Sequence, residues 1–411
     1  MYYLDEMKIA DIAARLGITE SAVKHRLYYA RETIKKGVDR MENYTLKPID
    51  IAFIGTGDPV GNDPGELAER SFSKSLVYLC KNTERSVKEL SEELGVPMPF
   101  VEEEAAIQVR GQNGYYGLLR KTDNGKYISN FIIVDYDDFM KVTETYKKNT
   151  DVIAERFDTF VRQNEQKILG MPFLNKQVDT RPIAWPLIAR VDWAFTESVV
   201  ERLKIKYFSD ISPIKRNYYK FGIATKGDQK YISRFYGCDG IKGNEISGYK
   251  EIFMSNMYGK RLQAHFHCGH NISNDAGLLL TIRAIGGLPL SSLSEDEKET
   301  AAKAIECGYI KKENNMLYPK ILASETDGIY WNIVDGFFKE IENFIEPVVD
   351  EMYGFIKKYV PKHLMGEYNI FALMTSSGLL DSMIEKCIEL GTLVPPENPL
   401  SAEGVIMTVK K

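Results

Sequence analysis

The sequence predicts an α+β protein of several domains. A short helix, a glycine and a basic helix open the chain, three helices and a β-hairpin follow, and a mixed α/β middle region with long connecting helices completes it. At 411 residues, the chain is longer than one hydrophobic core usually serves. The predicted segments are a helix-turn-helix at 1–43, a linker at 44–70, a winged-helix-like domain at 71–135, a connecting helix at 136–171, an aromatic-rich α/β domain at 172–290, and a helical region with winged-helix-like hairpins at 291–411.

The composition is that of a globular protein without an overall affinity for polyanions. The formal net charge is −5, so a nucleic-acid site has to be a local concentration of positive charge. The five cysteines are scattered and form no CxxC pair, which is typical of a reducing compartment. No signal peptide and no apolar run of membrane-spanning length are found. We expect a cytoplasmic protein without a membrane segment.

The segment at 1–43 has the pattern of two helices joined by a tight turn. Gly17 can adopt the left-handed conformation that ends a helix, and Thr19 is a good N-cap for the next one. The apolar face of the first helix consists of Ile9, Ile12, Ala13 and Leu16. The expected buried side of the second helix consists of Ala22, Val23, Leu27, Ala30 and Ile34. Two helices joined in this way constitute a helix-turn-helix.

The second helix carries its positive charge on the outer side. Between Ser21 and Arg40 there are six Lys/Arg residues and two acidic ones. The basic side chains on that side are Lys24, His25, Arg26, Arg31, Lys35 and Lys36. One-sided positive charge on a helix-turn-helix predicts binding of double-stranded DNA. The alternative is an ordinary helical hairpin whose basic face is solvated.

The stretch IADIAARLGITESAVKHRLYYAR resembles region 4 of sigma-70 type RNA polymerase sigma factors, especially the extracytoplasmic-function group. The residues in register with the family pattern are Ile12, Ala13, Leu16, Gly17, Ile18, Val23, Lys24, Arg26, Leu27, Ala30 and Arg31. Mild departures occur at Asp11, Thr19 and Ala22. The resemblance implies that the second helix enters the major groove of a promoter's −35 element, with RNA polymerase as a further partner. The side chains that would then face DNA are Ser21, Lys24, His25, Arg26 and Arg31.

These side chains divide into two expected roles. Lys24, Arg31, Lys35 and Lys36 are expected to contact phosphates, and Ser21, His25 and Arg26 are expected to contact base edges.

Two features of the sigma family are missing from this sequence. Region 4 normally has a further helix before the segment YYLDEM, and region 2, which melts the −10 element, is absent. An N-terminal truncation and completion of the unit by other packing remain open. We therefore expect a sigma-like regulator rather than a full sigma factor.

The segment at 71–135 has the order of a winged helix. Helices are predicted at Phe72–Cys80, after the cap residue Ser86, and at Pro97–Val109, followed by a hairpin with a D-N-G turn. The preceding linker contains a short strand at Ile49–Ile54 and the stretch GTGDPVGNDPG, which lacks the G-K-[ST] ending of a phosphate loop. We expect no nucleotide there.

The third helix of this predicted winged helix has the wrong charge for DNA. It carries Glu102, Glu103 and Glu104, which phosphates would repel. The basic residues are Arg110 near the helix end and Arg120, Lys121 and Lys126 on the wing. Contact with DNA through the wing and contact with a protein through the acidic helix are both open.

The remaining segments predict regulation rather than catalysis. The segment 136–171 is a connecting helix or a dimerisation helix, which leaves a homodimer open. The aromatic-rich segment 172–290 is either a ligand-sensing domain or a plain aromatic core. In 291–411, Ser294–Ala323 and the C-terminal stretch from Ser376 each follow the plan of helix, glycine and hairpin. A long helix at Ile329–Tyr359, interrupted near Pro347, lies between them.

The stretch HFHCGH is the densest group of metal-ligand residue types. On a strand, His265 and His267 would face the same side, and His270, Asp275 or a residue distant in the sequence could supply a third ligand for zinc or iron. Histidines without metal are the alternative, and we expect no cofactor. No nucleophile elbow, dinucleotide fingerprint or H-E-x-x-H helix is present, so we expect no enzyme, although a metal-dependent sensor or enzyme at His265 and His267 remains an alternative.

Taken together, the patterns predict a DNA-binding transcription regulator that uses its N-terminal helix-turn-helix and carries a C-terminal regulatory or ligand-sensing region. The alternative is a module that binds RNA polymerase or another regulator without reading DNA directly. Its support is the acidic stretch Glu102–Glu104.

Overall fold

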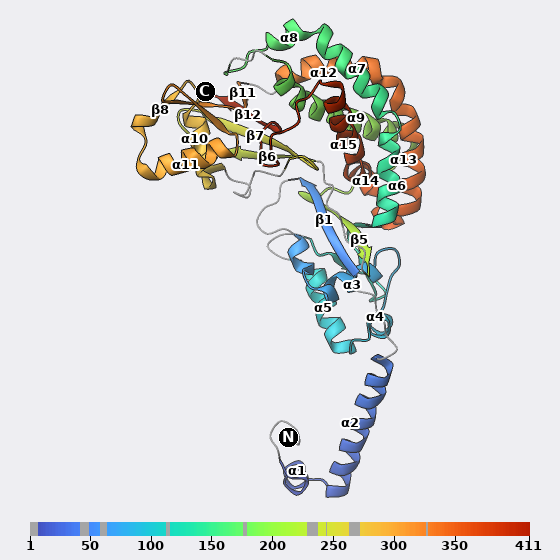
Figure 1. Ribbon diagram of the computed structural model, residues 1–411. Coiled ribbons are helices and arrows are strands. Elements are labelled where there is room, and N and C mark those ends of the chain that lie inside the picture. Colours follow the sequence, from blue (N-terminus) through green and yellow to red (C-terminus); the bar gives the residue numbers. More distant parts are fainter. Residues whose placement is uncertain are drawn as a thin grey trace. The chain divides into compact units, whose positions relative to one another are not determined.

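The protein has a mixed α/β architecture of helices and small sheets (Figure 1). The computed structural model describes residues 7–41, 49–57, 64–111, 116–175, 179–227, 237–243, 245–262, 272–325 and 328–411. The chain divides into two compact units. Unit 1 comprises Met1–Phe53, Gly57–Ile133 and Ala224–Gln229, and unit 2 comprises Ile54–Thr56, Val134–Ile223 and Lys230–Lys411.

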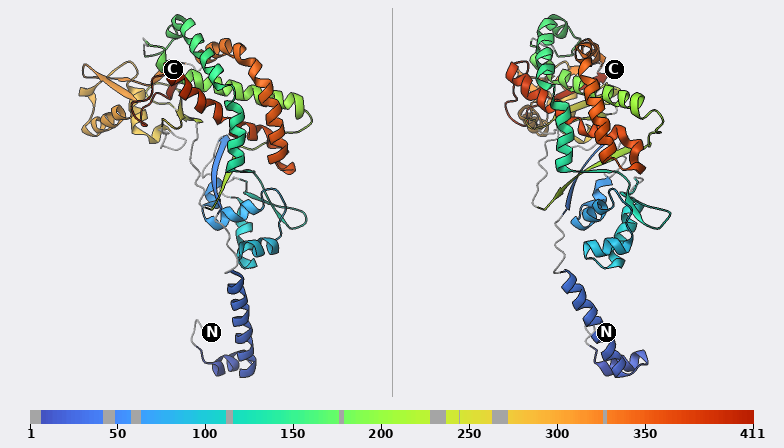
Figure 2. Two further views of the ribbon diagram at one scale, coloured as in Figure 1. Left: turned by 45° about the vertical axis from the view of Figure 1, so that its right-hand side comes forward. Right: turned by 90° about the vertical axis from the view of Figure 1, so that its right-hand side faces the viewer.

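Unit 1 begins with two helices, α1 (Ile9–Leu16) and α2 (Glu20–Met41), drawn in blue in Figure 2. Gly17 ends α1 in the left-handed conformation, with φ 65° and ψ 32°. The Thr19 hydroxyl accepts a hydrogen bond from the backbone N–H of Ala22 at 3.2 Å. Both predicted signals at the turn are therefore confirmed, and a turn of only a few residues separates the helices.

The second part of unit 1 has its helices and hairpin in the predicted order. It contains η1 (Pro64–Ala68), α3 (Ser71–Leu79), α4 (Val87–Leu94), α5 (Met98–Arg110), β2 (Leu119–Lys121) and β3 (Tyr127–Ser129). Ser86 and Glu89 form a capping box at the start of α4. The backbones of Arg85 and Tyr127 exchange hydrogen bonds of 2.8 and 2.7 Å, which adds an antiparallel bridge beside β3.

One core holds this second part together. Its most deeply buried side chains include Leu76 of α3, Leu90 of α4, Val101 of α5 and Phe131. Three further strands form a separate sheet with the order β1–β5–β4; they are β1 (Ile49–Gly57), β4 (Ile132–Asp135) and β5 (Tyr218–Lys226). The strand predicted at Ile49–Ile54 is thus confirmed and extends to Gly57.

Unit 2 contains a group of packed helices in which α9 (Arg181–Tyr207) contacts α12, α13, α14 and α15. The C-terminal members are α12 (Gly328–Ile341), η4 (Glu342–Phe344), α13 (Ile345–Tyr359), η5 (Lys362–Glu367), α14 (Tyr368–Thr375) and α15 (Ser377–Leu390). The break predicted near Pro347 lies at η4 instead. Pro347 sits in the first turn of α13, where its missing N–H has no helical partner to lose.

The helical segment that was predicted as one connector at 136–171 is divided. It consists of α6 (Tyr136–Lys147), α7 (Thr150–Gln163) and α8 (Glu165–Leu169). Asn149 and Asn164, with φ of −114° and −107°, leave the helical conformation at the two breaks. Helices α6 and α7 both pack against α15, so this segment is part of the helical group.

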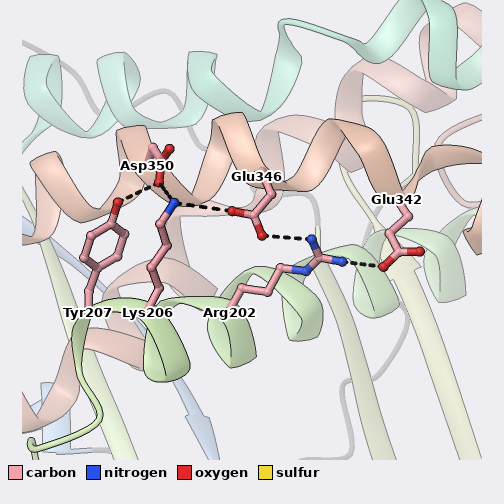
Figure 3. Close-up of polar contacts among 6 residues, drawn as sticks. All are labelled: Arg202, Lys206, Tyr207, Glu342, Glu346 and Asp350. Atoms are coloured by element: carbon pink, nitrogen blue, oxygen red, sulfur yellow. Dashed lines mark hydrogen bonds and ion pairs between the residues drawn. The ribbon is translucent and has the colours of Figure 1, made fainter.

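A row of ion pairs joins α9 to η4 and α13 (Figure 3). Arg202 binds Glu342 and Glu346 through its two terminal nitrogens, at 2.5 and 2.9 Å. Asp350 accepts hydrogen bonds from the Lys206 ammonium at 2.6 Å and from the Tyr207 hydroxyl at 2.7 Å. The acceptors are spaced four residues apart, which places them in a line along the facing helix.

Unit 2 also contains a four-stranded sheet with the order β11–β12–β7–β6. Its strands are β6 (Gly237–Gly243), β7 (Glu251–Tyr258), β11 (Leu322–Ser324) and β12 (Val405–Lys410). β12 is antiparallel to β7 and parallel to β11. The C-terminal hairpin predicted after α15 is therefore wrong: Pro395 and Pro396 cannot donate to a ladder, and the strand that follows them pairs with distant segments.

The predicted helix, glycine and hairpin at Ser294–Ala323 are confirmed. Helix α11 (Glu295–Glu306) ends before Gly308, whose φ is 74°. β9 (Ile310–Glu313) and β10 (Met316–Pro319) follow, and β8 (Leu288–Pro289) completes a sheet with the order β8–β10–β9. The neighbouring helical elements are η2 (Ile272–Asn274), α10 (Ala276–Arg283) and η3 (Leu290–Ser292).

Candidate nucleic-acid interface

The helix-turn-helix has a small core of its own. Ile12, Ala13 and Val23 are buried, and the half-buried side chains packed against them are Met7, Ile9, Ile18 and Leu27. Leu16 and Ala30, which the sequence places on the buried side, are exposed. Leu16 is in the last turn of the eight-residue helix α1, too near the chain reversal for α2 to cover it. The core fixes the angle between the two helices, although it buries only a few apolar side chains.

Helix α2 presents the predicted DNA-facing residues to solvent. Ser21, Lys24, His25, Arg26 and Arg31 are all exposed. Lys35 and Lys36 belong to the same helix, but their side chains lie outside the described part of the structure. The N-terminal half of α2 therefore exposes basic side chains around the side away from Val23.

Helix geometry divides this surface into a centre and two flanks. Successive residues rotate by about 100° around the axis, so Ser21 and His25 lie nearly opposite the buried Val23 and the half-buried Leu27. Lys24 is on one side of that line and Arg26 is on the other. Two short polar side chains in the middle with cations on both sides suit a groove lined by phosphates.

Two tyrosines on this helix were missed by the sequence reasoning. Tyr28 and Tyr29 are each 59% exposed, the largest exposed fractions among the big apolar side chains described on α2. The ring of Tyr29 contacts His25 edge-on with centroids 4.7 Å apart and contacts Tyr28 edge-on at 6.1 Å. Their exposure could have been predicted from their spacing, since neither position falls on the helix side that carries Val23 and Leu27.

The wing residues of the second part of unit 1 are only partly available for DNA. Arg120 and Lys121 on β2 are exposed. Lys126 pairs with Glu89 at 3.6 Å. The Ser86 backbone N–H and hydroxyl, with a smaller contribution from Lys126, lower the pKa of Glu89 to about 2. The wing therefore has fewer free cations than the sequence suggests.

The acidic face predicted on α5 needs a correction, because Glu104 is buried. Its carboxylate accepts hydrogen bonds from the Ser73 hydroxyl at 2.6 Å and the Gln108 amide at 2.9 Å, and it pairs with Arg70. Glu102 and Glu103 are exposed. Ser73 of α3, the N-cap residue Arg70 and Gln108 of α5 itself make burial of the third carboxylate tolerable. The sequence pattern alone does not reveal these partners.

Beside these two carboxylates lies an exposed apolar pair. Met98 is 48% exposed and Phe100 is 61% exposed, both in the first turn of α5. The flanking Pro97 and Pro99 are exposed as well. The N-terminal turn of α5 thus exposes apolar side chains, and exposed carboxylates follow them in the next turn.

The metal prediction lies outside the described residues. His265, His267 and His270 fall in the range 263–271, of which no structure is described. Asp275, considered as a third ligand, instead caps α10 by accepting hydrogen bonds from Gly277 and Leu278 at 2.9 and 3.0 Å. In the described part of the chain, no group of three or more His, Cys, Asp or Glu side chains is placed to hold a metal ion.

A pocket in unit 2 lies beside Trp185, Tyr258 and Arg261. Its empty volume is about 220 Å³, a figure that includes open solvent. Arg261 forms a two-pronged ion pair with Glu385 at 2.7 and 2.6 Å next to it. Ligand sensing by this region stays a prediction.

The geometry defines a helix-turn-helix with a basic second helix. Residues 1–34 match the family model described as Sigma-70, region 4, so the sigma resemblance of this segment is confirmed. A search of curated proteins gave no match to the chain, and a search of solved structures gave none either. None of the helices in the described ranges is both long and apolar enough to cross a membrane.

Proposed function

We propose that this protein is a transcription regulator that binds double-stranded DNA through α2. The carrying observation is the exposed basic surface of α2 beside a turn fixed by Gly17 and Thr19. The match of residues 1–34 to sigma-70 region 4 supports a promoter as the target. Ser21 and His25 face base edges, while Lys24 and Arg31 contact phosphates along one flank. Arg26, expected at a base edge, lies on the opposite flank and suits a phosphate of the other strand.

In this proposal the rest of the chain has a regulatory role. α3, α4 and α5 with the two-stranded hairpin β2–β3 act as a winged helix, supported by the single antiparallel bridge that joins Arg85 to Tyr127 of β3. Unit 2 acts as the regulatory region. The described free thiols of Cys80, Cys307 and Cys387 suit a reducing cytoplasm.

The test is DNA binding by fluorescence anisotropy across a salt series. Replacing Lys24 and Arg26 by Ala should weaken binding and lower the slope of log affinity against log salt by about one for each lost phosphate contact. The matched control is Lys167→Ala with Lys204→Ala, which removes two exposed cations from unit 2. If both double variants had the same DNA affinity and the same salt slope, the main support for DNA binding by α2 would be lost.

The exposed end of α5 favours a second candidate function, which is docking of RNA polymerase or another regulator. Aromatic and Met side chains beside charge are typical of protein contact surfaces, and Glu102 and Glu103 discourage DNA there. Phe100→Ser should then reduce capture of purified RNA polymerase by the intact chain. Val152→Ser, at another exposed apolar position, is the control, and equal capture by both variants would exclude polymerase docking at α5.

A further inference from the structure

Two large rings on the outer side of α2 need an explanation beyond charge. Tyr28 and Tyr29 expose more than half of their surface each, in a segment whose buried core consists of Ile12, Ala13 and Val23. Neither ring points toward that core, because both positions lie away from Val23 and Leu27 around the helix. With His25 they form a continuous set of ring contacts, named here the aromatic row (His25, Tyr28 and Tyr29).

The aromatic row continues the line along which α2 is proposed to read bases. Ser21, His25 and Tyr28 follow one another at spacings of four and three residues, which keeps them on one side of a helix. At about 1.5 Å per residue, Tyr28 lies about 10 Å beyond Ser21 along the axis. That distance corresponds to about three base pairs, since base pairs are about 3.4 Å apart. The row therefore reaches base pairs that Ser21 cannot.

The charges around the row decide which part of DNA it meets. Lys24 and Arg31 are on the flank next to Tyr28, and Arg26 is on the flank next to Tyr29. When these cations contact the two phosphate chains, the rings between them face the groove floor. The apolar group exposed there is the 5-methyl group of thymine, which apolar side chains read.

We propose that the aromatic row selects DNA sites with A·T base pairs by contacting thymine methyl groups. The inference rests on the proposed function and adds a specificity that positive charge cannot supply, because phosphates are the same at every sequence. A tyrosine hydroxyl bonded to phosphate is the competing arrangement. That hydrogen bond would be lost in a Tyr→Phe variant, and its strength would not depend on the methyl group of thymine.

The test removes single methyl groups from the DNA. Duplexes bound by the intact chain are selected from a random pool, and each thymine of the selected site is then replaced by deoxyuridine. At one or two positions the replacement should weaken binding about fourfold, the value of burying one methyl group. This loss should disappear in Tyr28→Ala or Tyr29→Ala and persist in Tyr28→Phe. Phe100→Ala, which removes an exposed ring elsewhere in unit 1, should leave it unchanged.

Each outcome decides the inference separately from the proposed function. If deoxyuridine has no effect at any position, or the same effect in Tyr28→Ala with Tyr29→Ala, methyl reading is wrong while Lys24-dependent binding can still stand. Loss of binding in Tyr28→Phe would assign the contact to a hydroxyl and phosphate instead. If the intact chain binds no duplex, the proposed function itself fails. Circular dichroism of the Ala variants checks that α2 is retained.

Discussion

Glu103 and Glu104 are adjacent in the chain and differ completely in environment. Glu103 is exposed, whereas Glu104 is 4% exposed and is held by Ser73, Gln108 and Arg70. The sequence shows three consecutive acids and gives no sign of which one turns inward. That choice depends on α3 and its N-cap residue, which lie about 30 residues earlier in the chain and supply Ser73 and Arg70. Burial of a charge is thus a tertiary property that local pattern reading misses.

Glu104→Ala should be destabilising because it leaves buried polar partners unsatisfied. We expect a loss of about 2 kcal/mol in the free energy of unfolding, a moderate value because the Arg70 side chain is 65% exposed. The measurement is urea unfolding at equilibrium. Glu103→Ala is the matched control and should be nearly neutral; similar losses in the two variants would contradict the role assigned to Glu104.

Asp192 makes stability depend on pH. Burial raises the pKa of its carboxyl to about 7, and the N–H of Leu380 opposes this only in part. Its Oδ1 has no hydrogen-bond partner among the described residues. The folded state holds the carboxyl proton more tightly than the unfolded state, so protonated Asp192 adds to the free energy of unfolding. This addition is complete below the ordinary pKa of 3.8 and is lost as the pH rises to about 7.

Asp192→Asn should therefore flatten the fall in unfolding free energy between those two pH values. Thermal melts across the range measure it. Asp210→Asn, at an exposed position, should keep the slope of the parent protein, and an unchanged slope in Asp192→Asn would show that the carboxyl does not titrate as argued.

At the scale of elements, helix ends with a capping residue were predictable and strand partners were not. Gly17, Thr19 and Ser86 act on backbone groups within a few residues, so their roles as caps follow from sequence alone. β12 pairs with β7 and β11, which are far away in the chain, and the residues of β12 do not indicate which strands it pairs with. These three capped helix ends therefore match the prediction, whereas the breaks within 136–171 and at η4, and the C-terminal strand pairing, do not.

The ion-pair row between α9 and α13 should stabilise unit 2 in a salt-dependent way. Arg202 and Lys206 share Glu346, so screening weakens the whole row together. Replacing both cations by Met should lower the melting temperature at low salt and lose most of that effect near 1 M salt. Lys298→Met with Lys303→Met, which breaks two exposed pairs within α11, is the control; a decrease that survives high salt would point to packing instead.

At the scale of the whole molecule, the family match describes only the N-terminal segment, whereas the structure describes both compact units. The match to sigma-70 region 4 ends at residue 34, and the two compact units rest on the structure alone. The sequence identified the exposed basic residues of α2 because charge and periodicity are local signals, and their contact with DNA stays a prediction. The domain boundaries, the sensing role and the homodimer depend on contacts that no local signal specifies, and they stay predictions.

Removing the first helices should separate α2 from the wing as the source of DNA affinity. A chain that begins at Tyr44 should lose most binding, because the cations of α2 are gone while only Arg120 and Lys121 remain exposed on β2. The measurement is the same anisotropy series with the intact chain beside it. Equal binding by both chains would assign the contact to the wing.

The position of β12 between β7 and β11 has a consequence for biosynthesis. The hairpin partners β6 and β7 leave the ribosome together, but β12 follows β7 by about 150 residues, which takes about 7 to 30 seconds at 5–20 residues per second. During that interval one edge of β7 has no strand to pair with, and such edges recruit other chains. Unit 2 should therefore depend on chaperones while nascent, and crowded polysomes should yield more aggregate than refolding of the finished chain at high dilution.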